Sequence, residues 1–129
     1  MKEVMAIVRL NKVSATKQAL AEAGFPSFTC RKVMGRGKKM IDPTVVAAIL
    51  ESGQLPVTTF GENITESYRL IPKRVFTLIV QNEDVSKIVD TLIDTNSTGN
   101  PGDGKIFVLP VMESYRVRNG EQQQDSEAY

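Results

Sequence analysis

Two parts of this chain repeat one order of predicted elements: a strand, then a helix, then a strand. Apolar and β-branched runs predict the strands at residues 2–10, 28–35, 74–81 and 105–111. The first helix would begin at its N-cap Ser14 and end at Gly24, and Asn82 is a candidate cap for the second. This order is typical of an α+β, ferredoxin-like βαββαβ fold, in which both helices cover one face of an antiparallel sheet.

The second predicted helix has a single apolar face, which would pack against that sheet. Its apolar residues recur at helical spacing at Val85, Ile88, Val89, Leu92 and Ile93. The sheet face away from the helices would also carry apolar side chains, so we expect the chain to form an oligomer. Pro110, near the end of the last strand, predicts a bulge or an edge position.

A long segment, residues 38–72, separates the two halves and exceeds the ~12–15 residues that a connection in a compact domain usually has. Within it, Asp42 and Pro43 predict the start of a short helix. That helix would carry an apolar stripe formed by Val45, Val46, Ile49 and Leu50. From spacing alone, the stripe fits equally well a surface that docks a protein partner and a helix packed on its own domain.

Length and composition favour one domain without a redox or disulfide framework. The chain has 129 residues, a formal net charge of +1, no histidine and one cysteine, Cys30. This excludes a catalytic Cys–His pair and gives no reason to expect nucleic-acid binding. No signal peptide or membrane span is evident, so we expect a cytoplasmic protein. We expect a domain of residues 1–120 and a polar, disordered tail of residues 121–129.

A glycine-rich turn from Thr98 to Gly104 precedes the last strand, which begins at Lys105. Glycines permit positive φ angles and close approach, and successive N–H groups in such a turn can bind an anion. Further along, Arg116 and Arg118 would point the same way if their segment were extended. We interpret the glycines and the three cations as a polyphosphate site rather than a plain β-turn beside a basic strand end. The spacing fits neither a Walker loop nor a dinucleotide fingerprint.

Three motifs resemble the PII signal-transduction family. The stretch from Thr98 to Val108 is similar to that family's T-G-K-I-G-D-G-K-I-F-V signature, and Arg116 to Glu121 is similar to its R-x-R-T-G-E ending. Val33 to Lys38 resembles the V-x-G-x-G-R element where the family's T-loop begins. The resemblance covers nearly the whole chain outside the middle of the long loop. It implies a trimer that binds ATP or ADP in clefts between subunits, with 2-oxoglutarate and magnesium as further ligands.

The resemblance also implies roles for individual residues, none of them catalytic and none a metal ligand. The nucleotide would contact Thr29, Gly35, Gly37, Lys38, Ile79, Gly102, Asp103, Gly104, Lys105, Arg116 and Arg118. Lys39 and Lys73 would face 2-oxoglutarate. However, Lys39 replaces the family's glutamine, and an ammonium group cannot coordinate magnesium. Lys38 replaces an arginine and keeps the charge without the bidentate fork. We therefore expect nucleotide binding, with weak 2-oxoglutarate binding by this chain alone.

The long loop, which corresponds to the T-loop, indicates a subgroup. It is longer than in ordinary members, and no tyrosine occurs between Lys38 and Tyr68. It resembles the longer-looped member of the PII-like pair that controls nitrogenase in methanogens and some anaerobic bacteria. This implies a regulator that docks on nitrogenase, as a homotrimer or in a mixed complex with a sister subunit. The alternatives are a PII protein that regulates an ammonium transporter or glutamine synthetase, an acyl-phosphate hydrolase and an RNA-binding module.

Overall fold

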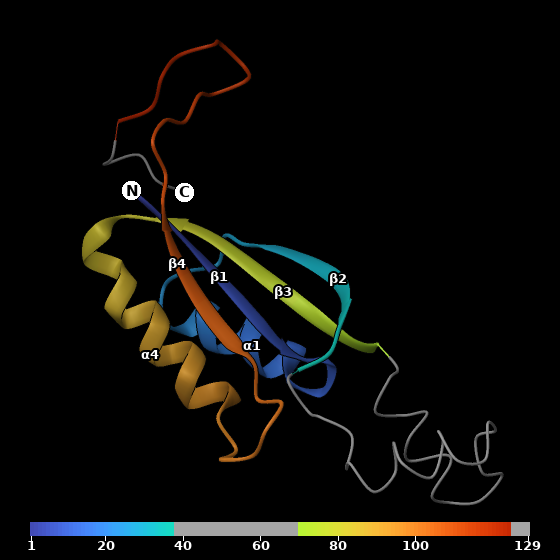
Figure 1. The fold of residues 1–129 in the computed structure, drawn as a ribbon. Coiled ribbons are helices and arrows are strands. Elements are labelled where there is room, and N and C mark those ends of the chain that lie inside the picture. Colours follow the sequence, from blue (N-terminus) through green and yellow to red (C-terminus); the bar gives the residue numbers. More distant parts are fainter. Residues whose placement is uncertain (38–69, 125–129) are drawn as a thin grey trace, which may run out of the picture. The chain divides into compact units, whose positions relative to one another are not determined.

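The structure is a computed structural model that describes residues 1–37 and 70–124 (Figure 1). The chain divides into two units, one formed by residues 1–33 and 72–129 and the other by residues 34–71. The packing and the site described below belong to the first unit. The middle of the T-loop, including the expected stripe of Val45, Val46, Ile49 and Leu50, lies outside the described residues, as do residues 125–129 of the tail.

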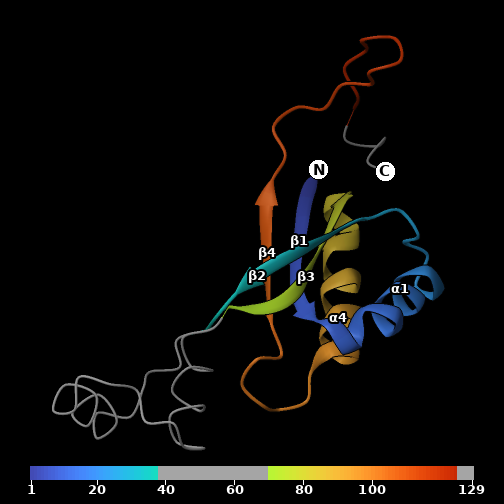
Figure 2. The ribbon, with the colours of Figure 1, turned by 90° about the vertical axis from the view of Figure 1, so that its right-hand side faces the viewer.

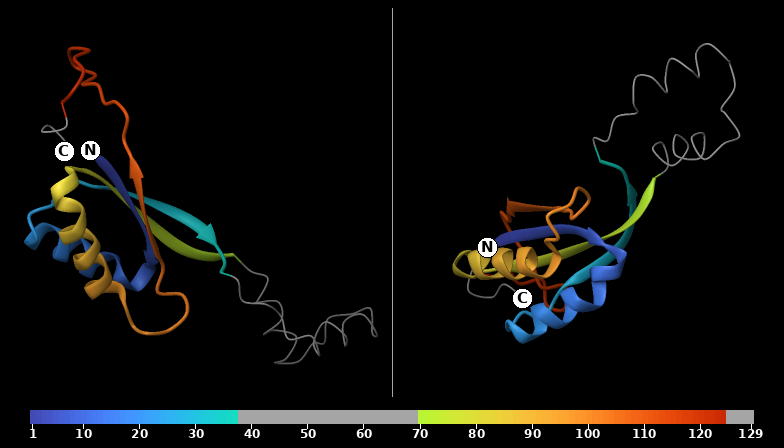
Figure 3. Two further views of the ribbon diagram at one scale, coloured as in Figure 1. Left: turned by 60° about the vertical axis from the view of Figure 1, so that its left-hand side comes forward. Right: turned by 90° about the horizontal axis from the view of Figure 1, so that it is seen from below.

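The strands form one sheet in the order β2-β3-β1-β4. The elements are β1 (Lys2–Arg9), α1 (Val13–Glu22), β2 (Thr29–Gly35), β3 (Ile71–Val80), α4 (Val85–Asn96) and β4 (Lys105–Pro110). The central strand β1 pairs antiparallel with both β3 and β4. Both helices lie on the same side of the sheet (Figures 2 and 3). The predicted α+β, ferredoxin-like order is therefore confirmed.

The core lies between the sheet and the two helices, and it follows from the alternation of side chains along β1. Val4, Ala6 and Val8 are buried at every second position, while their neighbours in the strand are less buried. They join a cluster with Leu20, Phe76, Leu78, Val80, Ile88 and Leu92. Ile93 was expected in this cluster, but it is 48% exposed. That prediction is wrong because a helix turns by about 100° per residue, which places Ile93 at the rim of the stripe.

Both helices begin differently from the sequence prediction. A 3₁₀ turn (Leu10–Lys12) runs directly into α1, so Lys12 and not Ser14 holds the N-cap position. A second 3₁₀ turn (Asn82–Asp84) precedes α4 in the same way, and Asp84 is its N-cap. The Asn82 side chain instead accepts a hydrogen bond from the amino terminus at 3.2 Å. In both places the chain leaves a strand through a tight turn that continues into the helix without a side-chain cap.

The predicted end of the first helix is confirmed in detail. Gly24 has a φ of 93°, which a residue with a side chain rarely adopts. Its N–H donates to the Ala21 carbonyl at 3.0 Å, and the Phe25 N–H donates to the Leu20 carbonyl at 2.8 Å. These are the two hydrogen bonds of a Schellman motif, so the glycine ends α1 and directs the chain towards β2.

The sheet face opposite the helices carries apolar side chains, as expected from the sequence. Met5 of β1 pairs with Phe107 of β4, which is 42% exposed, and Leu109 on the same strand is 38% exposed. In the part of the chain that the structure describes, no helix covers this face (Figure 2). Pro110 ends the edge strand β4 opposite Lys2, which confirms its predicted edge position.

Candidate functional site

The glycine turn joins the end of α4 at Asn96 to the start of β4 at Lys105. Its glycines Gly99, Gly102 and Gly104 have φ angles of 80°, 97° and 118°. A Cβ atom added at Gly104 would lie 1.8 Å from the main-chain oxygen of Ile7 in β1. Only glycine fits at this position, because the turn presses directly against the backbone of the central strand.

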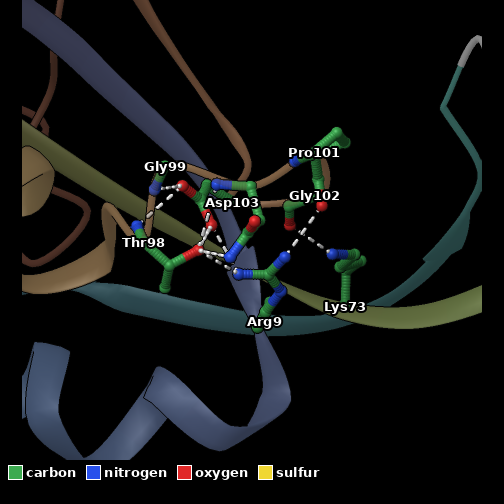
Figure 4. A network of polar contacts seen from close by, with 8 residues as sticks. Arg9, Lys73, Thr98, Gly99, Pro101, Gly102 and Asp103 are labelled. Carbon is green, nitrogen blue, oxygen red and sulfur yellow. Dashed lines mark hydrogen bonds and ion pairs between the residues drawn. The ribbon is translucent and has the colours of Figure 1, made fainter.

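The carboxylate of Asp103 lies inside the turn and bonds to the turn itself (Figure 4). Its Oδ2 accepts hydrogen bonds from the N–H groups of Thr98 at 2.7 Å and Gly99 at 3.0 Å. Its Oδ1 accepts from the Thr98 hydroxyl and from Nη1 of Arg9. The bonds from Thr98, followed by those from Arg9, hold the pKa of Asp103 well below its usual value. The side chain is therefore ionised at neutral pH.

Two cations from neighbouring strands contact the outer part of the turn. Arg9, the last residue of β1, donates from Nη2 to the Pro101 carbonyl at 2.9 Å and from Nη1 to the Thr98 hydroxyl at 3.2 Å. Lys73 of β3 donates to the Gly102 carbonyl at 2.8 Å. Burial, followed by the nearby Arg9, lowers the pKa of Lys73, and Asp103 opposes that shift. Two positive side chains, those of Arg9 and Lys73, thus contact a turn that itself carries the negative side chain of Asp103.

Sequence reasoning did not include Arg9 among the site residues, although a signal was available. Ile7 pairs with Lys105 in the antiparallel β1–β4 ladder, so the end of β1 must lie beside the turn that precedes β4. A basic residue at the end of the first predicted strand was therefore a candidate for contact with the glycine turn. Lys73, which the resemblance assigned to 2-oxoglutarate, also reaches this turn.

Two other predicted nucleotide residues come together on β2 and β3. Thr29 and Ile79 line one pocket, together with Ser27, Phe28 and Thr77. The pocket combines hydroxyl groups with an aromatic and an aliphatic side chain, a mixture that can contact the face and the polar edge of a planar base. Their assignment to the adenine stays a prediction.

Lys105 extends onto the open side of the sheet. Its ammonium group lies 5.7 Å from the centroid of the Phe107 ring, within the range of a cation–π contact. The side chain is exposed and immediately follows the glycine turn. Lys105 is therefore placed where it could exchange an aromatic contact for a contact with an anion at the turn.

Arg116 and Arg118 do not meet the glycine turn within one chain. The turn and the segment with Arg116 and Arg118 lie at opposite ends of β4 (Figure 1). The six residues of that strand span about 20 Å. The segment from Arg116 to Arg118 is not extended. The chain turns there, with the Gly120 N–H donating to the Arg116 carbonyl at 2.8 Å.

Backbone hydrogen bonds also involve the first residues of the predicted tail, whose disorder stays a prediction. The Arg116 N–H donates to the Glu121 carbonyl at 2.8 Å, and the Gln123 N–H donates to the Ser114 carbonyl at 2.8 Å.

The remaining predicted site residues lie outside the unit that contains the glycine turn or outside the described residues. Gly35 and Gly37 belong to the second unit, and Lys38 and Lys39 lie outside the described residues. Their place beside a nucleotide or 2-oxoglutarate stays a prediction.

Comparison with known protein families shows to which family this chain belongs. The family model described as nitrogen regulatory protein P-II matches residues 1–121. The chain belongs to the PII family. Among the residues that the structure describes, no helix is long and apolar enough to cross a membrane.

Relatives of this PII protein include proteins named for nitrogen fixation. The chain is 40% identical over 129 residues to the nitrogen fixation nifHD region GlnB-like protein 2 of Methanobacterium ivanovii, with 98% of each chain covered. It is 37% identical over 121 residues to the GlnB-like protein 1 of Methanothermococcus thermolithotrophicus, with 94% of this chain and 97% of the relative covered.

A solved structure has the same fold. Arabidopsis thaliana PII bound to citrate superimposes with a TM-score of 0.67 at 26% sequence identity, covering 99% of this chain and 90% of that one. The protein is thus similar along almost its whole length both to GlnB-like proteins of nitrogen fixation regions and to a plant PII protein.

Proposed function

We propose that this PII protein is a cytoplasmic regulator without enzymatic activity that binds ATP or ADP at the glycine turn and controls nitrogenase by protein binding. The observation that carries the proposal is its similarity to GlnB-like proteins of nitrogen fixation regions over nearly the full length of both chains. The described residues around the turn supply cations and main-chain donors, which suit phosphate binding better than they suit a nucleophile–base pair.

The contacts within the turn indicate which of its groups could donate hydrogen bonds to a phosphate. The N–H groups of Thr98 and Gly99 already bond to Asp103. The phosphates would therefore contact the later part of the turn, at Gly102 and Gly104, and the ammonium group of Lys105. Because these groups lie at an exposed loop end, their hydrogen bonds to a phosphate would be charge-assisted and would orient the nucleotide.

The nucleotide site needs more than one copy of the chain. Arg116 and Arg118 can reach a phosphate only if the C-terminal segment of another subunit approaches the glycine turn, because within one chain β4 separates them. The open apolar face of the sheet offers the contact area for such an assembly. We therefore propose a trimer, either of this chain alone or mixed with a sister PII-like subunit, with the nucleotide in the clefts between subunits.

Regulation would follow from a population shift of the T-loop. A ligand that binds one loop conformation better than another changes the affinity for a partner by the same differential free energy. We propose that 2-oxoglutarate with magnesium binds weakly to this chain alone, because Lys39 cannot act as a metal ligand. Tight 2-oxoglutarate binding to the purified single-chain assembly, measured by calorimetry with ATP and magnesium, would contradict this.

The test of the proposed function is a pull-down from a nitrogen-fixing lysate with the tagged protein, in buffer, ATP, ADP, or ATP with 2-oxoglutarate. We expect a nitrogenase component in an amount that depends on the ligand. Recovery of an ammonium transporter or glutamine synthetase instead would favour the alternative target.

A variant pair can locate the docking surface on the sequence-predicted loop stripe. Val46→Glu/Ile49→Glu should abolish recovery, whereas Thr58→Glu/Thr59→Glu, which adds the same charge to the same loop outside the stripe, should retain it. Calorimetry of ATP binding controls for folding of both variants. Equal recovery of both would show that the stripe does not dock the partner, and an unfolded stripe variant would favour a helix packed on its own domain.

A further inference from the structure

A carboxylate in the middle of a proposed phosphate site requires an explanation. Asp103 is ionised and follows Gly102 directly, so its charge would repel a polyphosphate at the turn by Coulomb interaction. Yet the side chain is not directed outward as a ligand group. It is 24% exposed, and its oxygens accept hydrogen bonds from Thr98, Gly99 and Arg9 (Figure 4).

Arg9 completes this arrangement from outside the turn. One nitrogen of its guanidinium contacts Asp103 and Thr98, near the two ends of the turn, while the other donates to the Pro101 carbonyl at its tip. The position of a Cβ atom on Gly102 would lie 3.1 Å from Arg9 Nη2, so the guanidinium is also packed against the turn backbone. The residue before it, Val8, is 3% exposed in the core, which fixes the base from which Arg9 extends.

We propose that Arg9 and Asp103 are positioning residues for the nucleotide: they act as a staple that holds the glycine turn in its binding conformation. The inference rests on the proposed nucleotide binding. Glycine-rich backbone has many alternative conformations, and ordering it during binding would lower the affinity. The staple orders the turn before the nucleotide binds. The Asp103 carboxylate does this by accepting hydrogen bonds from Arg9 and from the N–H groups of Thr98 and Gly99, so its charge is directed at these groups.

The staple and a purely electrostatic role of the same residues predict opposite changes in ATP affinity for one variant. Asp103→Asn keeps the shape of the side chain and removes one negative charge. If only charge mattered, ATP would bind more tightly to this variant. If the staple matters, ATP would bind more weakly, because asparagine has one acceptor oxygen and cannot accept both from the Thr98 and Gly99 N–H groups and from Arg9.

The test is calorimetry of ATP binding to the full chain and to four variants, with melting temperatures to show that each is folded. Asp103→Asn and Arg9→Met should each weaken ATP by roughly tenfold, the usual consequence of losing a charge-assisted hydrogen bond. The double variant should be little weaker than the worse single variant, because each residue acts through the other. Lys17→Met, which removes an exposed cation on α1, should bind ATP like the original protein. Equal or tighter binding by Asp103→Asn, or additive losses in the double variant, would overturn the inference.

A second measurement separates this inference from the proposed function. Amide hydrogen exchange without nucleotide should be faster at Thr98 and Gly99 in Asp103→Asn and Arg9→Met, while the amides of β1 keep their protection. Unchanged exchange at those two amides would overturn the staple whether or not ATP binds, whereas failure of the original protein to bind ATP would refute only the nucleotide proposal. Should Asp103→Asn not fold, Thr98→Val removes a hydroxyl that bonds to both residues and should give the same two results.

Discussion

Replacing Gly104 with alanine tests how the glycine turn is held against the sheet. The added Cβ would lie 1.8 Å from the Ile7 oxygen and 3.0 Å from the Ile7 carbonyl carbon, both main-chain atoms of the central strand. A backbone atom cannot rotate away as a side chain can, so either the turn or β1 must move by about 1 Å or more to reach van der Waals contact. The φ of 118° adds strain of its own, because a side chain disfavours positive φ.

The size of the effect follows from these two contributions. A residue held in a sparsely populated backbone region costs about 1–3 kcal/mol, and overpacking against an unyielding neighbour costs about 1–3 kcal/mol more. We therefore expect Gly104→Ala to lower the free energy of unfolding by between about 2 and 6 kcal/mol. Movement of the turn should also weaken ATP binding, because Lys105 follows Gly104 directly.

Gly24→Ala is the matched control for this prediction. Gly24 also has a positive φ, 93°, but nothing lies within 4 Å of a Cβ atom added there. Only the backbone strain remains, at about 1–2 kcal/mol, and ATP affinity should not change. Urea denaturation without nucleotide, at one fixed protein concentration, measures both variants. Equal losses of stability for Gly104→Ala and Gly24→Ala would refute the argument that close approach to β1 fixes the turn.

Three further predictions follow from individual contacts. Lys105→Ala should weaken ATP roughly ten- to a hundredfold in calorimetry, and unchanged affinity of the folded variant would contradict the phosphate assignment. Thr16→Val removes the hydroxyl to which buried Asn96 donates at 3.2 Å, while the bond from Asn96 to the Leu92 carbonyl stays, and should lower the free energy of unfolding by about 1–3 kcal/mol in urea. Thr91→Val, which removes a solvent-exposed hydrogen bond from the threonine hydroxyl to the Lys87 carbonyl, should change the free energy of unfolding by less than about 0.5 kcal/mol. Because folding lowers the pKa of Asp103, its contribution is present above the unfolded pKa and lost as pH falls through the folded value. In acid unfolding, the free energy of unfolding of the original protein should therefore fall relative to that of Asp103→Asn only below about pH 4. If the free energies of unfolding of both proteins fell in parallel with pH, this prediction would be refuted.

The arrangement of elements could be predicted because it depends on local patterns. Alternation along residues 2–9 and helical spacing from Val85 to Leu92 follow from the geometry of a strand and a helix, and each places its apolar residues in the core. The end of α1 just before Gly24 was predictable for the same reason, since a positive φ is a property of one residue. The helix starts were not, because a 3₁₀ turn and an N-cap compete at neighbouring positions.

The sequence by itself determined the strand and helix order, the glycine turn and its cations, and the motifs of the PII family. Only the tertiary structure decided which of these groups meet. It directed the carboxylate of Asp103 into the turn and joined it to Arg9, which is 94 positions away. Such contacts depend on the pairing register of β1 with β4, which opposes Ile7 to Lys105. The alternation along one strand determines which side chains face the core, but the register between strands that are distant in the chain is settled only when the whole sheet packs against its helices.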